Sequence, residues 1–328
     1  MYEQYYGLSL PPFELTTSPK ALFLSGGQRE ALSNLEYGLS TSKAITLVVG
    51  EAGTGKTTLV RAAMASEHCQ HVQCLYLHNP ALTRAEFLEA LARQFQLSRA
   101  AAQSKTTLLC ELEETLTARC ARNEAVALVI DEAQSLTHEV LEEIRLLANL
   151  ECGDRKLVPL VLAGQPELAQ RLNDPSLRQL KQRVALRCLL EPLTLSETGA
   201  YIAHRIRSAG GEAARLFTRE AVVLIHQQAG GLPRLVNVIC DNALLSGMAL
   251  GRQPVGRDVV AEVCRDFDFD AGHRVERYAR ENGARGDSPA VRPYATRVER
   301  EDLASGADAP ADGEIAVGSR AMGSSDER

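Results

Sequence analysis

The sequence has no apolar run of about 18 residues, the length that a membrane-spanning helix requires, so we expect no transmembrane segment. Its start, Met1 to Tyr6, lacks the basic and apolar regions of a secretory signal. The eight cysteines include no Cys-x-x-Cys pair, which together with the missing signal indicates reduced cytosolic thiols. An excess of positive charge is also absent, because the net charge is −6 and the isoelectric point is about 5.7. Nucleic-acid binding over the whole surface is therefore disfavoured, although a local basic face stays open.

What is present is an ordinary globular composition, with 45% apolar and 24% charged residues. At about 100–200 residues per domain, the length of 328 residues predicts two domains. We expect a first domain at 1–191, a small all-helical domain at 192–268 and a disordered polar tail at 269–328. The tail contains few branched aliphatic residues, so it cannot bury enough apolar area to offset the entropy of ordering. A tether or partner-binding segment is the alternative interpretation of the tail.

Short apolar runs alternate with amphipathic stretches in the first domain. The runs are Ala44–Val49, Val72–Leu77, Ala125–Ile130, Leu157–Ala163 and Val184–Leu190. The amphipathic stretches are Thr58–Ser66, Thr83–Phe95, Thr106–Arg119 and Leu136–Leu150. Apolar runs separated by helices predict an α/β fold, a parallel sheet with helices on both faces.

The strand pattern ends after Pro192, and helical patterns follow. They cover Ser196–Ala209, Thr218–Ala229, Pro233–Leu250 and Gly256–Asp266. Ser196 and Thr218 are the expected N-caps of the first two helices, because a hydroxyl there can accept a hydrogen bond from a free backbone N–H.

A phosphate-binding pattern, G-x-x-x-x-G-K-[ST], lies between a predicted strand and a predicted helix. Its residues are Gly50, Glu51, Ala52, Gly53, Thr54, Gly55, Lys56 and Thr57, and Thr58 continues into the helix. The glycines let backbone N–H groups surround phosphate oxygens, and the helix N-terminus adds positive potential. Lys56 supplies a charge for the β- and γ-phosphates, and Thr57 offers a hydroxyl to Mg²⁺. The pattern therefore predicts a nucleotide site.

The apolar run Ala125–Ile130 ends in two carboxylates, Asp131 and Glu132. In phosphate-loop enzymes, an aspartate at a strand end helps to hold Mg²⁺, and a following glutamate can polarise the attacking water. Taken alone, Asp-Glu after a strand is more often a solvated turn. The phosphate-binding loop upstream favours the catalytic interpretation, with Thr57 and Asp131 at the metal and Glu132 as the catalytic carboxylate.

Two further polar residues occupy places that suggest contact with a nucleotide. Gln165 follows the fourth apolar run and is a candidate for contacting the γ-phosphate or positioning water; the alternative is a simple helix start at Pro166. Arg234 lies in the first turn of a predicted helix, where a cation opposes the helix dipole. A residue placed against local preference suggests an anion ligand, with a plain exposed arginine as the alternative.

The segment Arg171–Arg187 carries five basic residues against a single acidic one, Asp174. Arg183, just before the fifth run, is a candidate for neutralising the γ-phosphate of a neighbouring subunit, and Arg178 is the alternate candidate. A solvated basic face is the alternative interpretation.

In this order, the motifs resemble those of the AAA+ ATPases. Over about residues 1–265 they also resemble the ATPase domain of the general secretion pathway protein A family, to which exosortase-locus ATPases and transposition ATPases of the MuB and TniB type are related. The segments that carry this narrower resemblance are Tyr5–Leu8 with Pro12–Phe13, Gln28–Leu32, Asp131–Gln134, Leu162–Leu168, Leu177–Arg183 and Gly231–Asn237.

The resemblance implies a five-stranded P-loop sheet, a helical lid, and ATP with Mg²⁺ rather than GTP. It implies Gln165 as sensor 1, Arg234 as sensor 2, and Arg183 as an arginine finger acting in trans, and hence a homo-oligomer. It also implies that residues 6–29 border the adenine.

That family typically continues into a transmembrane helix and a periplasmic domain, whereas a polar tail follows here. We therefore expect a cytoplasmic ATPase that converts ATP and water to ADP and phosphate. It would support a secretion or envelope-assembly system, reaching the inner membrane through a protein partner. One alternative is a transposition-type ATPase that binds duplex DNA, which the acidic isoelectric point disfavours. Another is a nucleotide-dependent scaffold with negligible turnover, against which the Asp131–Glu132 pair argues.

Overall fold

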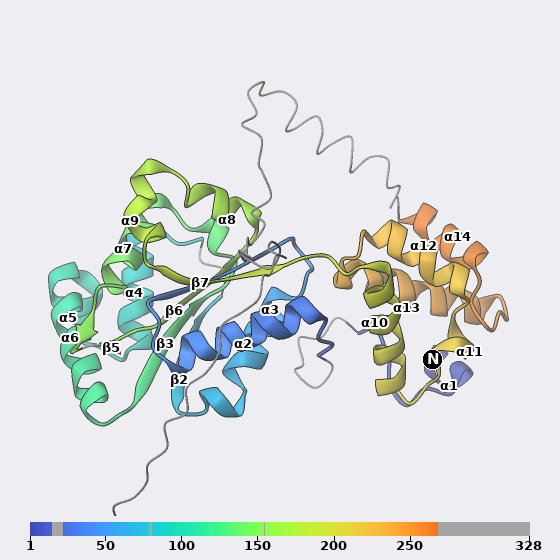
Figure 1. Ribbon diagram of the computed structural model, residues 1–328, viewed down its shortest axis with the longest axis horizontal. Helices are drawn as coiled ribbons and strands as arrows, with labels where there is room; N and C mark the ends of the chain where they lie inside the picture. Colours follow the sequence, from blue (N-terminus) through green and yellow to red (C-terminus); the bar gives the residue numbers. More distant parts are fainter. Residues whose placement is uncertain (15–21, 79–80, 154, 268–328) are drawn as a thin grey trace, which may run out of the picture. The chain divides into compact units, whose positions relative to one another are not determined.

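The computed structural model describes residues 1–14, 22–78, 81–153 and 155–267 (Figure 1). All of them belong to one compact unit. The polar tail expected at 269–328 lies outside the described residues.

A parallel five-stranded sheet forms the centre of the first part of the chain, which confirms the predicted fold class. Its strands lie in the order β2-β3-β6-β1-β7. Their bounds are β1 (Ile45–Gly50), β2 (Val72–Leu77), β3 (Ala125–Ile130), β6 (Leu160–Gly164) and β7 (Val184–Leu190). Because all strands are parallel, their carboxyl ends share one edge, where ligands bind in open α/β sheets.

The fourth strand begins later than predicted. A short antiparallel hairpin comes first, and residues 157–159 connect this hairpin to β6. The hairpin pairs β4 (Glu151–Cys152) with β5 (Arg155–Lys156). Apolar residues thus continue upstream of the paired strand, and Leu157 is buried without belonging to it.

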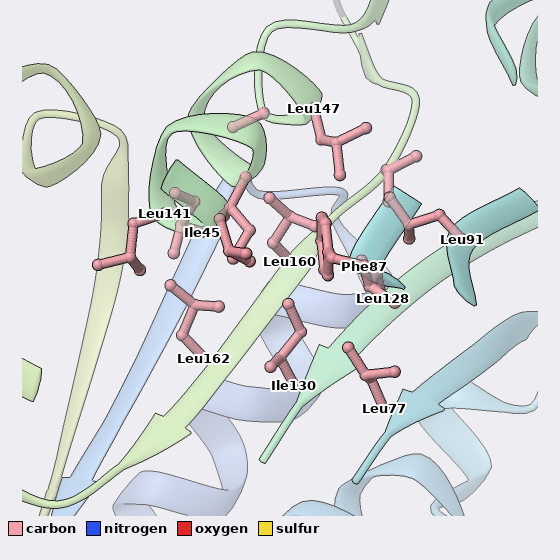
Figure 2. Close-up of a cluster of buried hydrophobic side chains, with 14 of the residues drawn as sticks. Ile45, Leu77, Phe87, Leu91, Leu128, Ile130, Leu141, Leu147, Leu160 and Leu162 are labelled. Carbon is pink, nitrogen blue, oxygen red and sulfur yellow. The ribbon is translucent and has the colours of Figure 1, made fainter. Parts of the chain in front are cut away.

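One face of the sheet carries the larger hydrophobic cluster, drawn in Figure 2. Its strand side chains include Ile45, Leu128 and Leu160, each fully buried. The helices that contribute to it are α4 (Arg84–Gln94), α5 (Arg99–Gln103), α6 (Lys105–Ala121), α7 (His138–Leu147), α8 (Pro166–Arg171) and α9 (Arg178–Lys181). Each such leucine or isoleucine stabilises the fold by about 1.5–3 kcal/mol relative to exposure.

The opposite face is covered by α2 (Gly26–Ser40) and α3 (Lys56–Met64) (Figure 1). Alternation along β1 divides its residues between the two faces: Ile45 and Leu47 belong to the first cluster and Val48 to the second. Both faces are therefore apolar, as the continuous apolar runs predict. Short 3-10 turns lie at Glu67–Cys69, Ala133–Ser135 and Pro175–Leu177.

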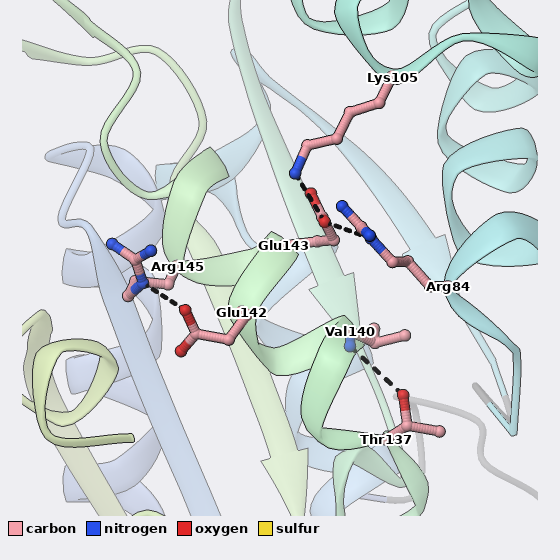
Figure 3. Close-up of polar contacts among 7 residues, drawn as sticks. All are labelled: Arg84, Lys105, Thr137, Val140, Glu142, Glu143 and Arg145. Atoms are coloured by element: carbon pink, nitrogen blue, oxygen red, sulfur yellow. Dashed lines mark hydrogen bonds and ion pairs between the residues drawn. The ribbon is translucent and has the colours of Figure 1, made fainter. Parts of the chain in front are cut away.

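An ion cluster around the buried Glu143 joins helices of the first face to one another (Figure 3). Glu143 on α7 accepts from Arg84 Nε at 2.6 Å and from Lys105 Nζ at 2.8 Å. Its side chain is only 5% exposed. Since the two cations come from α4 and α6, the cluster joins three helices.

After β7 the described chain is helical, apart from an isolated bridge between Phe217 and Val255. The helices are α10 (Leu195–Ser208), α11 (Ala213–Leu216), α12 (Arg219–Ala229), α13 (Pro233–Ala249) and α14 (Arg257–Asp266). Thr218 caps α12 as predicted. The N-cap predicted at Ser196 is wrong: Thr194 caps α10, because Thr194 and Glu197 form a reciprocal capping box.

The N-terminal segment packs with these helices rather than with the sheet. Helix α1 (Tyr2–Tyr6) places two tyrosines in their hydrophobic cluster, and Phe13 joins it. Tyr6 donates to the carbonyl of Leu244 at 3.1 Å. These residues fall within the first domain expected at 1–191, whereas their aromatic rings are buried among the later helices. None of the helices in the described ranges is long and apolar enough to cross a bilayer.

Candidate nucleotide-binding site

The phosphate-binding loop connects β1 to α3 at the carboxyl edge of the sheet. Gly53 and Gly55 have φ values of +87° and +96°, which glycine adopts without the steric penalty of a side chain. A Cβ at Gly53 would also lie 2.9 Å from the Cβ of Arg234. Glycine is therefore required at position 53 for two reasons: the backbone conformation and the close approach of α13.

Lys56 opens α3 and is buried against the loop. Its Nζ donates to the carbonyls of Gly50 at 2.8 Å and Glu51 at 2.9 Å. Burial lowers the pKa of Lys56, while the carboxylates of Glu132 and Asp131 oppose this effect. The loop thus holds the Lys56 amino group against its own carbonyls, and the contact of this group with phosphate stays a prediction.

Asp131 is completely buried, and it contacts the loop directly. Thr57 Oγ1 donates to its Oδ2 at 2.6 Å, and the backbone N–H of Glu132 donates to its Oδ1 at 2.9 Å. A hydroxyl that donates its hydrogen keeps its lone pairs free to bind a cation. Hydroxyl and carboxylate oxygens are ligands that suit Mg²⁺, so Thr57 and Asp131 fit such an ion.

A third donor to Asp131 was not anticipated from the sequence. The hydroxyl of Tyr76, on β2, donates to Oδ2 at 2.6 Å. Burial and then Asp131 itself raise the pKa of Tyr76 well above its ordinary value, so the phenol keeps the proton that it donates. The only sequence signal for this contact is the place of Tyr76 near the end of a strand.

Glu132 follows with an unusual backbone and a fixed side chain. Its φ is +54°, a left-handed conformation that is uncommon outside glycine. Gln134 Nε2 donates to its carboxylate at 2.6 Å, and Gln134 Oε1 accepts from the backbone N–H of Gln165 at 3.1 Å. The Gln134 amide therefore links the end of β3 to the end of β6, which the sequence analysis missed.

Gln165 lies beside this link at the N-cap of α8. Its contact with Gln134 is made by the backbone, and among the described residues it is not one that lines the cavity. Arg171, at the other end of α8, donates from Nη1 to the carbonyl of Gln134 at 2.7 Å. The structure thus brings Gln165 close to Glu132, and its role remains a prediction.

A cavity of about 350 Å³ opens above the loop, which is within the range of small-molecule sites. Its lining includes the polar side chains of Lys56, Thr57 and Glu132 and the aromatic rings of Phe23 and Tyr201. The predicted residues that line it are Ala52, Gly53, Thr54, Gly55, Lys56, Thr57, Thr58, Glu132 and Arg234. The remaining loop residues, Gly50 and Glu51, contact Lys56 through their backbone carbonyls.

Arg234 lies in the first turn of α13, after Pro233. Its backbone N–H donates to the carbonyl of Gly53 at 3.2 Å, and its side chain is exposed at the cavity. The predicted approach of this arginine to the phosphate loop is therefore present in the geometry. A contact with phosphate remains a prediction.

Arg183 lies far from the loop of its own chain. Val184 of β7 pairs with Ile45, at the amino end of β1, whereas Leu190 pairs with Gly50. Arg183 thus precedes the amino end of β7, at the edge of the sheet opposite the loop. Its Nε is buried without a hydrogen-bond partner among the described residues. The alternate candidate, Arg178, is exposed on α9.

Comparisons with known proteins agree with this arrangement. Residues 39–172 match the AAA domain family. General secretion pathway protein A from Aeromonas hydrophila is 40% identical over 255 residues, which are 78% of this chain and 46% of that protein. The chain therefore spans about half the length of this relative.

Solved structures share the fold at low sequence identity. The Cdc6p structure from Pyrobaculum aerophilum has a TM-score of 0.60 and 19% identity, covering 78% of this chain and 70% of that chain. The ORC2 protein of Aeropyrum pernix, in ADPNP-ADP complexes, has a TM-score of 0.58 and 17% identity, covering 77% and 70%. With the loop, the paired carboxylates and the strand order, these similarities show that residues 39–172 belong to the AAA domain family and that the chain is related to general secretion pathway protein A.

Proposed function

We propose that the chain binds ATP with Mg²⁺ and hydrolyses it to ADP and phosphate. The observation that carries the proposal is the meeting of Thr57 and Asp131 at 2.6 Å beside the buried Lys56. Thr57 and Lys56 line the cavity, and Asp131 lies directly beside Thr57, so hard oxygen ligands and a positive charge are close to one another there. The aromatic and aliphatic residues that also line that cavity suit a purine base.

Each residue of the cavity has a definite task in this proposal. Lys56 and the backbone N–H groups of the loop bind the phosphates, and Thr57 with Asp131 holds Mg²⁺. A Mg²⁺ ion held by Thr57 and Asp131 would offset the negative charge that develops during phosphoryl transfer. Glu132 orients the attacking water, and Gln134 keeps the Glu132 carboxylate directed by its 2.6 Å hydrogen bond.

Other copies of the chain complete the site. Arg183 cannot reach the loop of its own chain, so its action as an arginine finger requires a neighbouring subunit. We therefore infer a homo-oligomer, with Arg178 as the alternate finger. Gln165, directly after β6, and Arg234, on α13, would sense the γ-phosphate.

The relationship to general secretion pathway protein A supports a wider role in a secretion or envelope-assembly system. In this role the chain acts from the cytoplasm, with a protein partner linking it to the inner membrane. The free energy of ATP hydrolysis would drive a change in that partner.

Nucleotide binding and phosphate release test the proposal. Lys56→Ala should abolish binding of a fluorescent ATP analogue, while Lys43→Ala, a lysine beside Tyr37 on the exposed end of α2, should leave it unchanged. Glu132→Gln should bind but not turn over, with Glu139→Gln on the exposed start of α7 as its control. Wild-type turnover in the Glu132→Gln variant would contradict the assigned role.

Mixing two inactive variants tests the oligomer. Arg183→Ala supplies an intact Glu132, and Glu132→Gln supplies an intact Arg183, so mixed assemblies should regain turnover. No recovery with Arg183→Ala, but recovery with Arg178→Ala, would move the finger to Arg178. Duplex DNA belongs in the same assay: strong stimulation would favour the transposition-type alternative and would direct attention to the exposed Arg178, Lys181 and Arg187.

A further inference from the structure

Three hydrogen bonds hold the carboxylate of Asp131, and one of the donors lies outside the recognised motifs. Oδ2 accepts from Thr57 and from Tyr76, both at 2.6 Å, and Oδ1 accepts from the Glu132 backbone at 2.9 Å. Donors on both oxygens fix the plane of the carboxylate as well as its position. Of the two hydroxyls, only that of Thr57 lies in the phosphate loop.

The alternation of side chains along β2 places the Tyr76 ring on the face of the sheet that α3 covers. Tyr76 pairs with Val129 in the parallel register of β2 and β3, two residues before Asp131. Cys74 and Tyr76 both pack with the cluster under α2 and α3, so the ring points toward the phosphate-loop helix.

The ring and the backbone of Tyr76 are both held in place. The guanidinium of Arg61, one turn after Thr57 on α3, lies 5.7 Å from the ring centroid. Gln94 Nε2, at the end of α4, donates to the Tyr76 carbonyl at 3.2 Å. Contacts from two helices therefore hold the Tyr76 side chain in the orientation that directs its hydroxyl to Asp131. A ring that only filled space would not need such contacts.

We propose that Tyr76 is a positioning residue for the Mg²⁺ that accompanies the nucleotide, an inference that rests on the proposed function. Tyr76 holds Asp131, and Asp131 in turn accepts the hydroxyl hydrogen of Thr57, which leaves the lone pairs of Thr57 for the metal ion. Hydrogen-bond partners of metal ligands typically contribute about 10–100-fold to metal affinity. Tyr76 therefore sets the affinity for Mg²⁺ without touching the phosphates.

Tyr76→Phe tests this inference, because it removes the hydroxyl and keeps the ring beside Arg61. The probe is a nonhydrolysable β,γ-imido ATP carrying an N-methylanthraniloyl label, titrated first in EDTA and then at rising Mg²⁺. We expect unchanged affinity in EDTA and a Mg²⁺ midpoint raised about tenfold or more. Tyr37→Phe, on an exposed ring of α2, is the matched control and should match the wild type in both titrations.

An unchanged Mg²⁺ midpoint in Tyr76→Phe would overturn the inference. Equal weakening with and without Mg²⁺ would also overturn it, because that pattern indicates support of the fold alone. In an Asp131→Asn background, Tyr76→Phe should shift the midpoint no further, and an added shift would show that Tyr76 does not act through Asp131. If the affinity of the wild-type protein for the probe does not depend on Mg²⁺, the proposed function itself fails. This result differs from the outcomes above, which concern only the Tyr76→Phe variant.

Discussion

Asp131 and Glu143 are both buried carboxylates, only twelve residues apart, yet the chain surrounds them differently. Glu143 accepts from two cations, Arg84 and Lys105, within 2.8 Å. The donors that contact Asp131 are two hydroxyls and a backbone N–H, all uncharged. Lys56 is close enough for Asp131 to influence its pKa, but its own hydrogen bonds go to loop carbonyls.

This difference separates a structural carboxylate from one prepared for a ligand. A buried charge is tolerated when it is paired and hydrogen-bonded. Glu143 finds its counter-charges within the fold, where they join α7 to α4 and α6. Asp131 is oriented by neutral donors, one of which is the cavity-lining Thr57, so its negative charge remains available to a cation that arrives with the nucleotide.

The largest effect should come from Asp131→Asn. We expect turnover to fall about 100-fold or more, because a metal-holding carboxylate is lost, while the free energy of unfolding changes little. Phosphate release and urea titration measure the two quantities. Glu143→Gln is the control and should keep turnover per folded molecule, so an equal loss of turnover in both variants would break the comparison.

Removing both counter-charges of Glu143 should affect stability instead. Arg84→Met with Lys105→Met leaves a buried carboxylate unpaired, and we expect the free energy of unfolding to fall by about 3 kcal/mol. Arg93→Met, which disrupts an exposed pair with Glu89, should change it by less than about 0.5 kcal/mol. Urea titration of each variant gives the comparison. A double variant as stable as Arg93→Met would show that the ion cluster does not stabilise the fold.

Gln134→Leu should have an intermediate effect on turnover. It removes the donor to Glu132 and the acceptor for the Gln165 N–H, so we expect kcat to fall about tenfold with nucleotide affinity unchanged. Steady-state kinetics and probe binding separate these terms. Gln170→Leu, on the exposed side of α8, is the matched control. If Gln134→Leu changed only the affinity for nucleotide, this expectation would be wrong, because Gln134 would then act in nucleotide binding.

Lys105→Met alone should have the smallest effect. Arg84 still pairs with Glu143 at 2.6 Å, and Lys105 is 32% exposed, so we expect a loss of only about 0.5–1 kcal/mol in unfolding free energy. Urea titration beside the double variant checks this. If the single variant lost as much as the double one, Lys105 would carry the pairing and Arg84 would be dispensable.

The sequence predicted what depends on local pattern. Val72–Leu77 and Val184–Leu190 are strands with the predicted bounds, because both are apolar runs bounded by polar or turn residues. The helical stretches between the strands are all present, with boundaries shifted by up to three residues (Leu150 predicted, Leu147 observed). The phosphate loop was predictable because its chemistry requires particular residues at fixed spacing.

Features that depend on tertiary contact could not be predicted. Helix α2 was missed because Gly26, Gly27 and Gly38 weaken its pattern. Gly38 is nevertheless suited to its place, since a Cβ there would lie 2.2 Å from Thr46 Oγ1 on β1. The contact of Tyr76 with Asp131 requires β2 to lie beside β3, and strand order is not written in either run.

The most direct test of the central claim is phosphate release by the wild-type protein and Glu132→Gln at saturating ATP, with Mg²⁺ and with EDTA. Nucleotide binding is measured on the same samples. The proposed ATPase activity predicts wild-type turnover only with Mg²⁺, and bound but unhydrolysed ATP in Glu132→Gln. Equal turnover in the two proteins, or turnover that persists in EDTA, would contradict it.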